Sequence, residues 1–136
     1  MGRRNPSEVF WTLSLLAFLL ASSGTEGAAW LRVSEGKGTS VMYIDPGSVK
    51  KIDADTVSAR TREVPLEPVK IGDETLIEIT SYTEFRCAKN QFRTAETTYS
   101  YKSGKTERIT AEGMRTWKAV SKASTKDVHD YLCKRP

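Results

Sequence analysis

The residues of this 136-residue chain best suited to chemistry are its two cysteines. Cys87 ends the segment SYTEFRC, and Cys133 lies near the C-terminus in DVHDYLCKRP. Such a pair can form a disulfide, bind a metal ion, act as a reactive dyad or remain as two unrelated buried thiols. The only histidine, His129, precedes Cys133 by four residues. On a helix these two side chains would share a face, where they could meet one metal ion or pair as nucleophile and base.

The N-terminus bears on this choice because it predicts export. Two arginines precede the apolar run Val9–Ala21, whose length of about 13 residues is that of a secretory signal core. A membrane-spanning helix needs about 20 residues. Small residues stand at −3 and −1 of a cleavage site before Trp30. We therefore expect residues 1–29 to be a cleaved signal peptide and 30–136 to be one mature domain; the alternative is an uncleaved anchor. No cysteine lies near the cleavage region, so we do not expect a lipoprotein.

Export favours a disulfide between Cys87 and Cys133, since thiol pairs are normally oxidised outside the cytosol. A single histidine and the lack of a CxxC motif argue against a metal site, and a thiol held in a disulfide cannot act as a nucleophile. We expect no metal and no cofactor. The net charge of +4 is spread over interleaved positive and negative side chains, so it does not indicate a nucleic-acid partner.

The mature chain reads as short strands separated by turns. Strand-like stretches occur at 29–35, 39–45, 56–64, 75–87, 91–102, 106–110 and 114–120. Between them, residues 64–74 contain two prolines and predict an extended connection. We expect its apolar residues, among them Leu66, Val69 and Ile71, to fold back over an edge of the core. The alternative is an exposed loop that touches a partner.

The strand at 75–87 predicts which side of the sheet is buried. Ile77, Phe85 and Cys87 share one parity and face the core unless a bulge shifts the register, whereas Tyr82 has the opposite parity.

A helix is expected at about 125–134, with Ser124 as its N-cap. Its apolar stripe is Val128, Tyr131 and Leu132. The predicted fold class is α+β: an antiparallel sheet of about six strands with a C-terminal helix packed on one face and tied by a disulfide.

This pattern resembles the surface-adhesin protein E family of exported bacterial proteins. The resemblance is carried by AWLRV at the start of the mature chain, VMYIDPGSV at 41–49, YTEFRCAKNQFR at 82–93, TWKAV at 116–120 and the terminal helix with Cys133. It implies an antiparallel sheet with a disulfide-tied C-terminal helix. It also implies an adhesin, since the founding member binds host matrix and serum proteins. No motif here matches a host-binding segment.

The residues do not predict an enzyme. Glu78 and Glu84 lie about 20 Å apart along one strand, too far to act on one bond. The sequence has no GxSxG, phosphate loop or dinucleotide fingerprint. A small hydrolase with an unfamiliar site is the least favoured alternative.

Aromatic and basic residues supply the remaining candidates. We expect Trp30, Tyr43, Phe85, Tyr99 and Trp117 to pack in the core. The exposed Tyr82 and nearby cations could form a partner-contact face, although a solvated sheet face is the simpler interpretation; the cations are Lys89, Arg93, Lys102, Lys105 and Arg108.

We thus expect an exported, non-enzymatic binding or adhesion module in the periplasm or at the cell surface. Its partner would be a protein ligand or envelope component, with homodimerisation through the same surface as a further use and no membrane contact beyond the signal peptide. The alternative is a periplasmic accessory or inhibitor protein that acts on another envelope protein.

Overall fold

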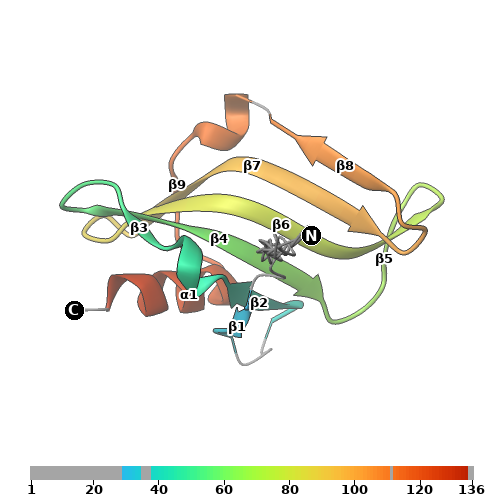
Figure 1. Cartoon of the computed structure of the whole chain (residues 1–136), viewed down its shortest axis with the longest axis horizontal. Coiled ribbons are helices and arrows are strands. Elements are labelled where there is room, and N and C mark those ends of the chain that lie inside the picture. The colour runs from blue at the N-terminus through green and yellow to red at the C-terminus, as the bar shows by residue number, and fades with distance from the viewer. Residues whose placement is uncertain (1–28, 35–37, 111, 135–136) are drawn as a thin grey trace, which may run out of the picture.

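The computed structural model describes residues 29–34, 38–110 and 112–134, so the predicted signal peptide lies outside the described residues apart from Ala29. The described chain is mostly antiparallel sheet with one helix (Figure 1). Its elements are β1 Leu31–Arg32, β2 Ser40–Ile44, η1 Pro46–Ser48, β3 Lys50–Lys51, β4 Thr56–Pro65, β5 Val69–Ile71, β6 Glu74–Arg86, β7 Gln91–Tyr101, β8 Thr106–Ile109, η2 Glu112–Arg115, β9 Lys118–Ala119 and α1 Ala123–Cys133.

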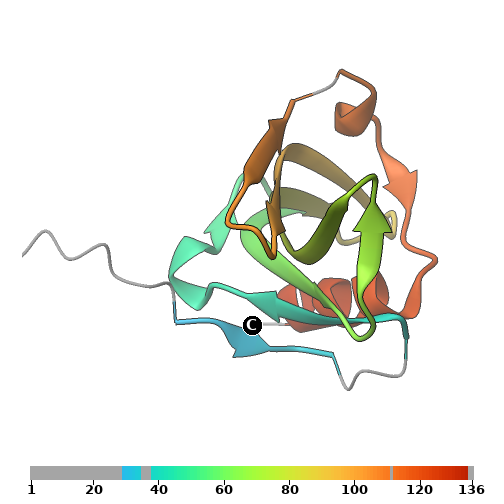
Figure 2. The same ribbon diagram turned by 90° about the vertical axis from the view of Figure 1, so that its right-hand side faces the viewer.

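The sheet is built around three long strands, β4, β6 and β7, which pair in that order. The path of hydrogen-bonded neighbours is β1-β2-β4-β6-β7-β8, and the short strands β3, β5 and β9 pair with β4, β6 and β7. Six strands thus form the main path, as expected, and nine occur in the described residues. Figure 2 shows that the sheet is strongly curved and arches over α1.

Two irregularities in the β6–β7 ladder accompany this curvature. Between Leu76 and Glu78 the register shifts by one residue of β6, and Thr83 pairs with Thr94 although Tyr82 pairs with Glu96. Bulges of this kind bend a strand and increase its twist. The first one reverses the expected orientation at the start of β6: Leu76 is 5% exposed, whereas Ile77, expected on the core face, is 47% exposed.

The core lies between the inner side of the arch and α1. Phe85 from β6, Ile44 from β2 and Val128 from α1 are almost completely buried and belong to one cluster with Met42, Ala59 and Leu132. These residues come from alternate positions of three strands and from one stripe of the helix. The predicted apolar stripe of the helix is therefore confirmed, and Tyr131 packs against the same cluster.

The helix begins slightly earlier than predicted. Its N-cap is Lys122, which makes no side-chain cap hydrogen bond, and Ser124 lies inside the first turn. The expected Ser124 cap was wrong because the chain leaves β9 only a few residues before the helix, which places the first turn at Ala123.

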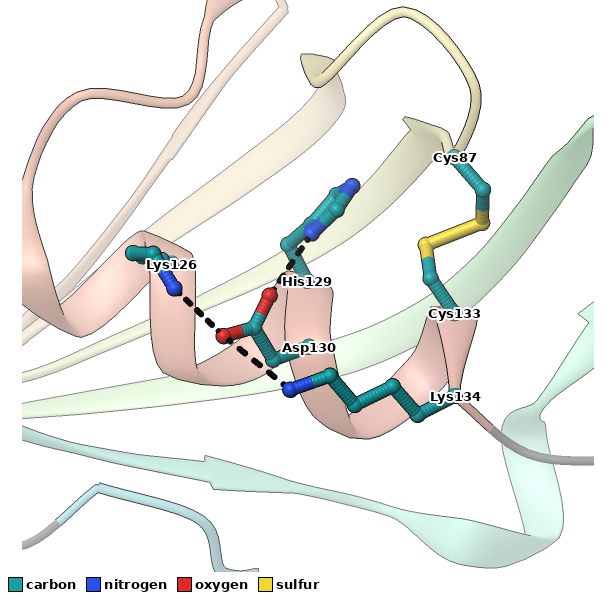
Figure 3. A network of polar contacts seen from close by, with 6 residues as sticks. All are labelled: Cys87, Lys126, His129, Asp130, Cys133 and Lys134. Atoms are coloured by element: carbon teal, nitrogen blue, oxygen red, sulfur yellow. Dashed lines mark hydrogen bonds and ion pairs between the residues drawn. A yellow bond between two sulfur atoms is a disulfide. The ribbon is translucent and has the colours of Figure 1, made fainter.

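The predicted disulfide is present and joins the end of β6 to the end of α1 (Figure 3). The Cα atoms of Cys87 and Cys133 lie 5.5 Å apart, which is within the usual range. The bond fixes the last turn of the helix to the sheet at the side where β6 turns into β7. It therefore holds Val128 and Leu132 in the core.

Two segments differ from expectation. In the stretch 114–120 only Lys118 and Ala119 form a strand, because only these two pair with the edge of β7, and residues 114–115 belong to the 3-10 turn η2. The stretch 64–74 contains β5, which forms a hairpin with β6 instead of covering the core. Leu66, Val69 and Ile71 are 51, 42 and 46% exposed, because the hairpin extends beyond the part of the sheet that α1 covers.

Within the described part of the chain, no helix combines the length and the apolar character needed to cross a membrane.

A carboxylate on α1, Asp130, is contacted by three side chains of the helix and its C-cap (Figure 3). Lys126 Nζ donates to Asp130 Oδ2 at 2.6 Å, His129 Nδ1 lies 3.2 Å from Oδ1, and Lys134 Nζ lies 3.8 Å from Oδ2. The hydrogen bond from Lys126 is the main cause that lowers the pKa of Asp130 from 3.8 to about 2, followed by that from His129. The folded state therefore stabilises the charged carboxylate.

Removing the disulfide should destabilise the protein strongly. The two cysteines are 46 residues apart, and a loop of this size contributes about 4 kcal/mol through the entropy of the unfolded chain. We expect the double variant Cys87→Ser, Cys133→Ser to lose about 2–4 kcal/mol in urea unfolding. Wild type in reductant is the matched control and should lose a similar amount. An unchanged midpoint in both would contradict the tether.

The pKa of Asp130 predicts an acid-dependent contribution to stability. A carboxylate with a lowered folded-state pKa stabilises the protein above about pH 4 and loses this contribution as the pH falls through about 2. We expect Asp130→Asn to cost about 0.5–1 kcal/mol at pH 7, because solvent screens the pair, and progressively less as the pH falls from about 4 toward 2. Urea unfolding across this range measures it, with Asp127→Asn as control. A difference from wild type that stays constant with pH would refute the assignment.

Candidate functional site

The outer face of the sheet, on the side away from α1, is the candidate site. Strand pairing brings its residues together, since Arg60 lies opposite Tyr82, Tyr82 opposite Glu96, and Glu84 opposite Arg93. Their neighbours along the strands, such as Ala59 and Phe85, point inward and are buried. We define the outer face by its charged and polar side chains: Arg60 and Arg62 of β4, Glu78, Thr80, Tyr82, Glu84 and Arg86 of β6, Arg93, Glu96 and Thr98 of β7, and Arg108 of β8.

Ion pairs connect neighbouring strands across this face. Arg62 Nε donates to Glu78 Oε2 at 2.7 Å, and Arg108 Nη2 donates to Glu96 Oε2 at 2.6 Å. Arg93 Nε donates to Glu84 in the same way. The hydrogen bond to Glu96 raises the pKa of Arg108. Pairs this exposed contribute little to stability, so their main effect is to hold the side chains in place.

Aromatic rings hold four of the arginines by stacking. The guanidinium carbons of Arg60 and Arg62 lie 5.5 and 5.9 Å from the centroid of the Trp30 ring. At the other end of the face, those of Arg86 and Arg93 lie 3.9 and 4.5 Å from the Trp117 ring. These distances are within the range of cation–π interactions. The face thus carries two clusters of arginines that are pre-oriented by tryptophan.

These stacks correct one prediction about the aromatic residues. Phe85 is 1% exposed and lies in the core as expected. Trp30, Tyr43 and Trp117 are only half-buried and lie against arginines, with Tyr43 stacked on Arg62 at 5.4 Å. Tyr99 is also half-buried. The expectation was wrong because strand alternation does not reveal that these rings lie against arginine side chains. The guanidinium groups cover the rings in place of apolar side chains.

Tyr82 is the exposed aromatic centre of the outer face. Its side chain is 49% exposed and lies between Arg60 and Glu96. The groups around it line a shallow hollow of about 280 Å³ whose other residues are polar: Thr80, Ser81 and Thr98. A ring with an exposed face and adjacent charged donors and acceptors is typical of residues that dominate protein interfaces.

The structure brings together only part of the predicted contact face. Tyr82, Arg93 and Arg108 lie on the outer face of β6, β7 and β8. Lys89 lies in the turn before β7, whereas Lys102 and Lys105 lie in the turn after it. Lys105 Nζ lies 5.9 Å from the centroid of the Tyr101 ring. The lysines therefore occupy opposite ends of an 11-residue strand.

Sequence reasoning missed Arg60, Arg62 and Arg86 as site residues. The parity of Arg60 and Arg62 opposite Ala59 already places them on the wet side of the sheet. The contacts of Arg60 and Arg62 with Trp30, and of Arg86 with Trp117, join segments that are distant in the chain. Alternation within one strand cannot predict such contacts.

The carboxylates of the outer face are held in ion pairs with arginines. Glu78 and Glu84 each hydrogen bond to an arginine. His129 is 6% exposed and lies edge-on to Phe85 in the core, away from this face. Both sulfur atoms are in the disulfide, and among the described residues no group of three or more His, Cys, Asp or Glu side chains is placed to hold a metal ion.

Comparisons with known proteins identify relatives of the fold. The family model described as surface-adhesin protein E matches residues 30–134. A solved structure of Haemophilus influenzae protein E is similar with a TM-score of 0.51 and 13% identity, over 76% of this chain and 83% of that chain. Its selenomethionine form gives 0.51 and 12%, over 76% and 84%. Identities this low show a shared fold only. No curated protein matches the chain at a significant level.

Because Trp117 stacks on two arginines, its removal should cost less free energy of unfolding than the removal of a core tryptophan. We expect Trp117→Ala to lower the free energy of unfolding by about 1–2 kcal/mol, from the loss of two cation–π contacts and some apolar area. A tryptophan removed from a core costs about 3–5 kcal/mol. Urea unfolding distinguishes the two, and Arg108→Lys, which leaves the stack intact, should change little. A loss above 3 kcal/mol would restore the core interpretation.

Proposed function

Because the chain belongs to the surface-adhesin protein E family, we propose that it is an exported binding module that recognises a protein ligand and carries out no reaction. The disulfide supports export, since such bonds form and persist outside the cytosol. The proposed location is the periplasm or the cell surface. No cofactor enters this proposal.

The outer face is the surface proposed to contact the ligand, and the exposed Tyr82 between ordered charges is the observation that carries the proposal. Trp30 and Trp117 restrict Arg60 and Arg86 before a ligand arrives, so these side chains lose less conformational entropy on binding. Among the described residues neither of these two arginines forms an ion pair. Their N–H groups are therefore available to acceptors of a partner, while Tyr82 supplies apolar area and a hydroxyl group.

A second candidate function rests on a different surface. Leu66, Val69, Ile71 and Ile77 are each more than 40% exposed around the β5 hairpin. A group of exposed apolar side chains is typical of a protein-interaction site. We propose, as the alternative, that this hairpin contacts another envelope protein, for which the chain would be an accessory or inhibitor.

The two proposals predict different effects of matched substitutions. The purified protein is first tested against matrix and serum proteins and against envelope extracts, and the affinity of any captured protein is then measured with variants. If the outer face binds, Tyr82→Ala should weaken binding at least tenfold, as expected of an interface hot spot, and Ile71→Ala should not.

The opposite outcome, with Ile71→Ala weakening binding and Tyr82→Ala neutral, would replace the outer face by the β5 hairpin. Both residues are about half exposed, so each variant is the control for the other. Thermal unfolding of both variants excludes general destabilisation. If neither substitution changes the affinity of any captured protein, both proposed surfaces are wrong.

A further inference from the structure

Two connected hollows lie on the inner side of the sheet, where the start of α1 leaves part of the arch open. The first is a recess of about 100 Å³ between sheet and helix, and the second is a wider groove of about 560 Å³ beside β9. Glu63, Phe92 and Thr125 line both, so the recess opens into the groove. The recess shares only Ser81 with the hollow around Tyr82, and the groove shares no residue with that hollow. The backbone of Ser81 lies between the two sides of the sheet.

The recess is suited to an apolar group of limited size. Its apolar walls include Met42, Phe85, Phe92 and Val128. The hydroxyl groups of Thr61 and Thr83 also line it, and they bond to one another at 3.1 Å. Because these polar groups already have partners, an apolar group can enter without leaving them unpaired. A cavity of about 150 Å³ holds benzene, so this smaller one suits a branched aliphatic side chain.

The groove offers charges of both signs. Glu63 stands on β4, and its Oε1 accepts a hydrogen bond from Ser40 Oγ at 2.7 Å. Lys118 of β9 and Lys122, just before α1, line the same groove. No ion pair joins Glu63 to either lysine in the described part of the chain. The carboxylate and the two ammonium groups therefore remain able to bind opposite charges of one ligand.

We propose that this groove and recess form a binding site for a short peptide with free termini and a small aliphatic side chain. The peptide's ammonium group pairs with Glu63, its carboxylate with Lys118 and Lys122, and its side chain enters the recess. A fatty acid would supply no positive charge to pair with Glu63. A volume of about 560 Å³ exceeds that of one amino acid but lies within the usual range for ligand pockets. The site is separate from the outer face and does not depend on the proposed function.

The test is calorimetric titration of the purified protein with valyl-alanine, its N-acetyl derivative, its C-terminal amide and free valine. We expect valyl-alanine to bind and each blocked form to bind about tenfold more weakly, as expected for the loss of one charge-assisted hydrogen bond. Free valine should also bind more weakly, because it cannot span the groove. If valyl-alanine gives no binding up to about 10 mM, or if both blocked forms bind as tightly as valyl-alanine, the proposal is overturned.

Variants locate the contacts. Glu63→Gln should weaken the binding of valyl-alanine about tenfold and make the affinity insensitive to N-acetylation of the peptide. The double variant Lys118→Gln, Lys122→Gln should weaken binding by a similar factor and make the affinity insensitive to C-terminal amidation. Thr94→Leu should fill the recess and weaken all ligands. Glu112→Gln and Lys102→Gln, at exposed positions outside both hollows, are the matched controls. If a groove variant unfolds, the blocked peptides still test the same charge on the unaltered protein. Equal effects in variants and controls would refute the site.

Discussion

The covalent link between the end of β6 and the end of α1 is the constraint on which the rest of the structure depends. On the inner side of the arch, Met42, Ile44, Ala59 and Phe85 form a buried apolar cluster, and α1 packs on it through Val128 and Leu132. A C-terminal helix of 11 residues would fray in isolation, since isolated helices of this length are marginal in water. The disulfide fixes its last turn, and the helix in turn keeps the strands curved around one small core.

The two sides of the sheet therefore differ in composition: the inner side is packed against the helix, and the outer side carries charged and polar groups. The inner side supplies the packing energy, and its hydroxyl groups bond to one another in pairs, Thr61 with Thr83 and Ser81 with Thr97. The outer side is not needed for the core, so it can carry guanidinium groups, carboxylates and an exposed ring. Stacking on Trp30 and Trp117 gives these long side chains defined positions without burying their charges. Recognition is thus compatible with a very small hydrophobic core.

Much of this division follows from the sequence. The alternation in β6 correctly places Phe85 inward and Tyr82 outward, and the cysteine positions predict the tether. The same alternation fails at Leu76 and Ile77, because a bulge inserts one residue and nothing local marks it. The β5 hairpin was missed because prolines beside a short strand resemble a connection. The arginine–tryptophan clusters join residues far apart in the chain, so only the folded structure reveals them.

The disulfide closes a covalent ring that contains β7, β8, β9 and the whole of α1. A protease that cuts any single peptide bond between Cys87 and Cys133 would therefore produce two fragments that stay attached to each other. Both clusters of the outer face would remain on one molecule after such a nick, since Arg60 lies before the ring and Arg93 within it. This geometry provides tolerance to proteolytic damage that noncovalent packing alone would not give.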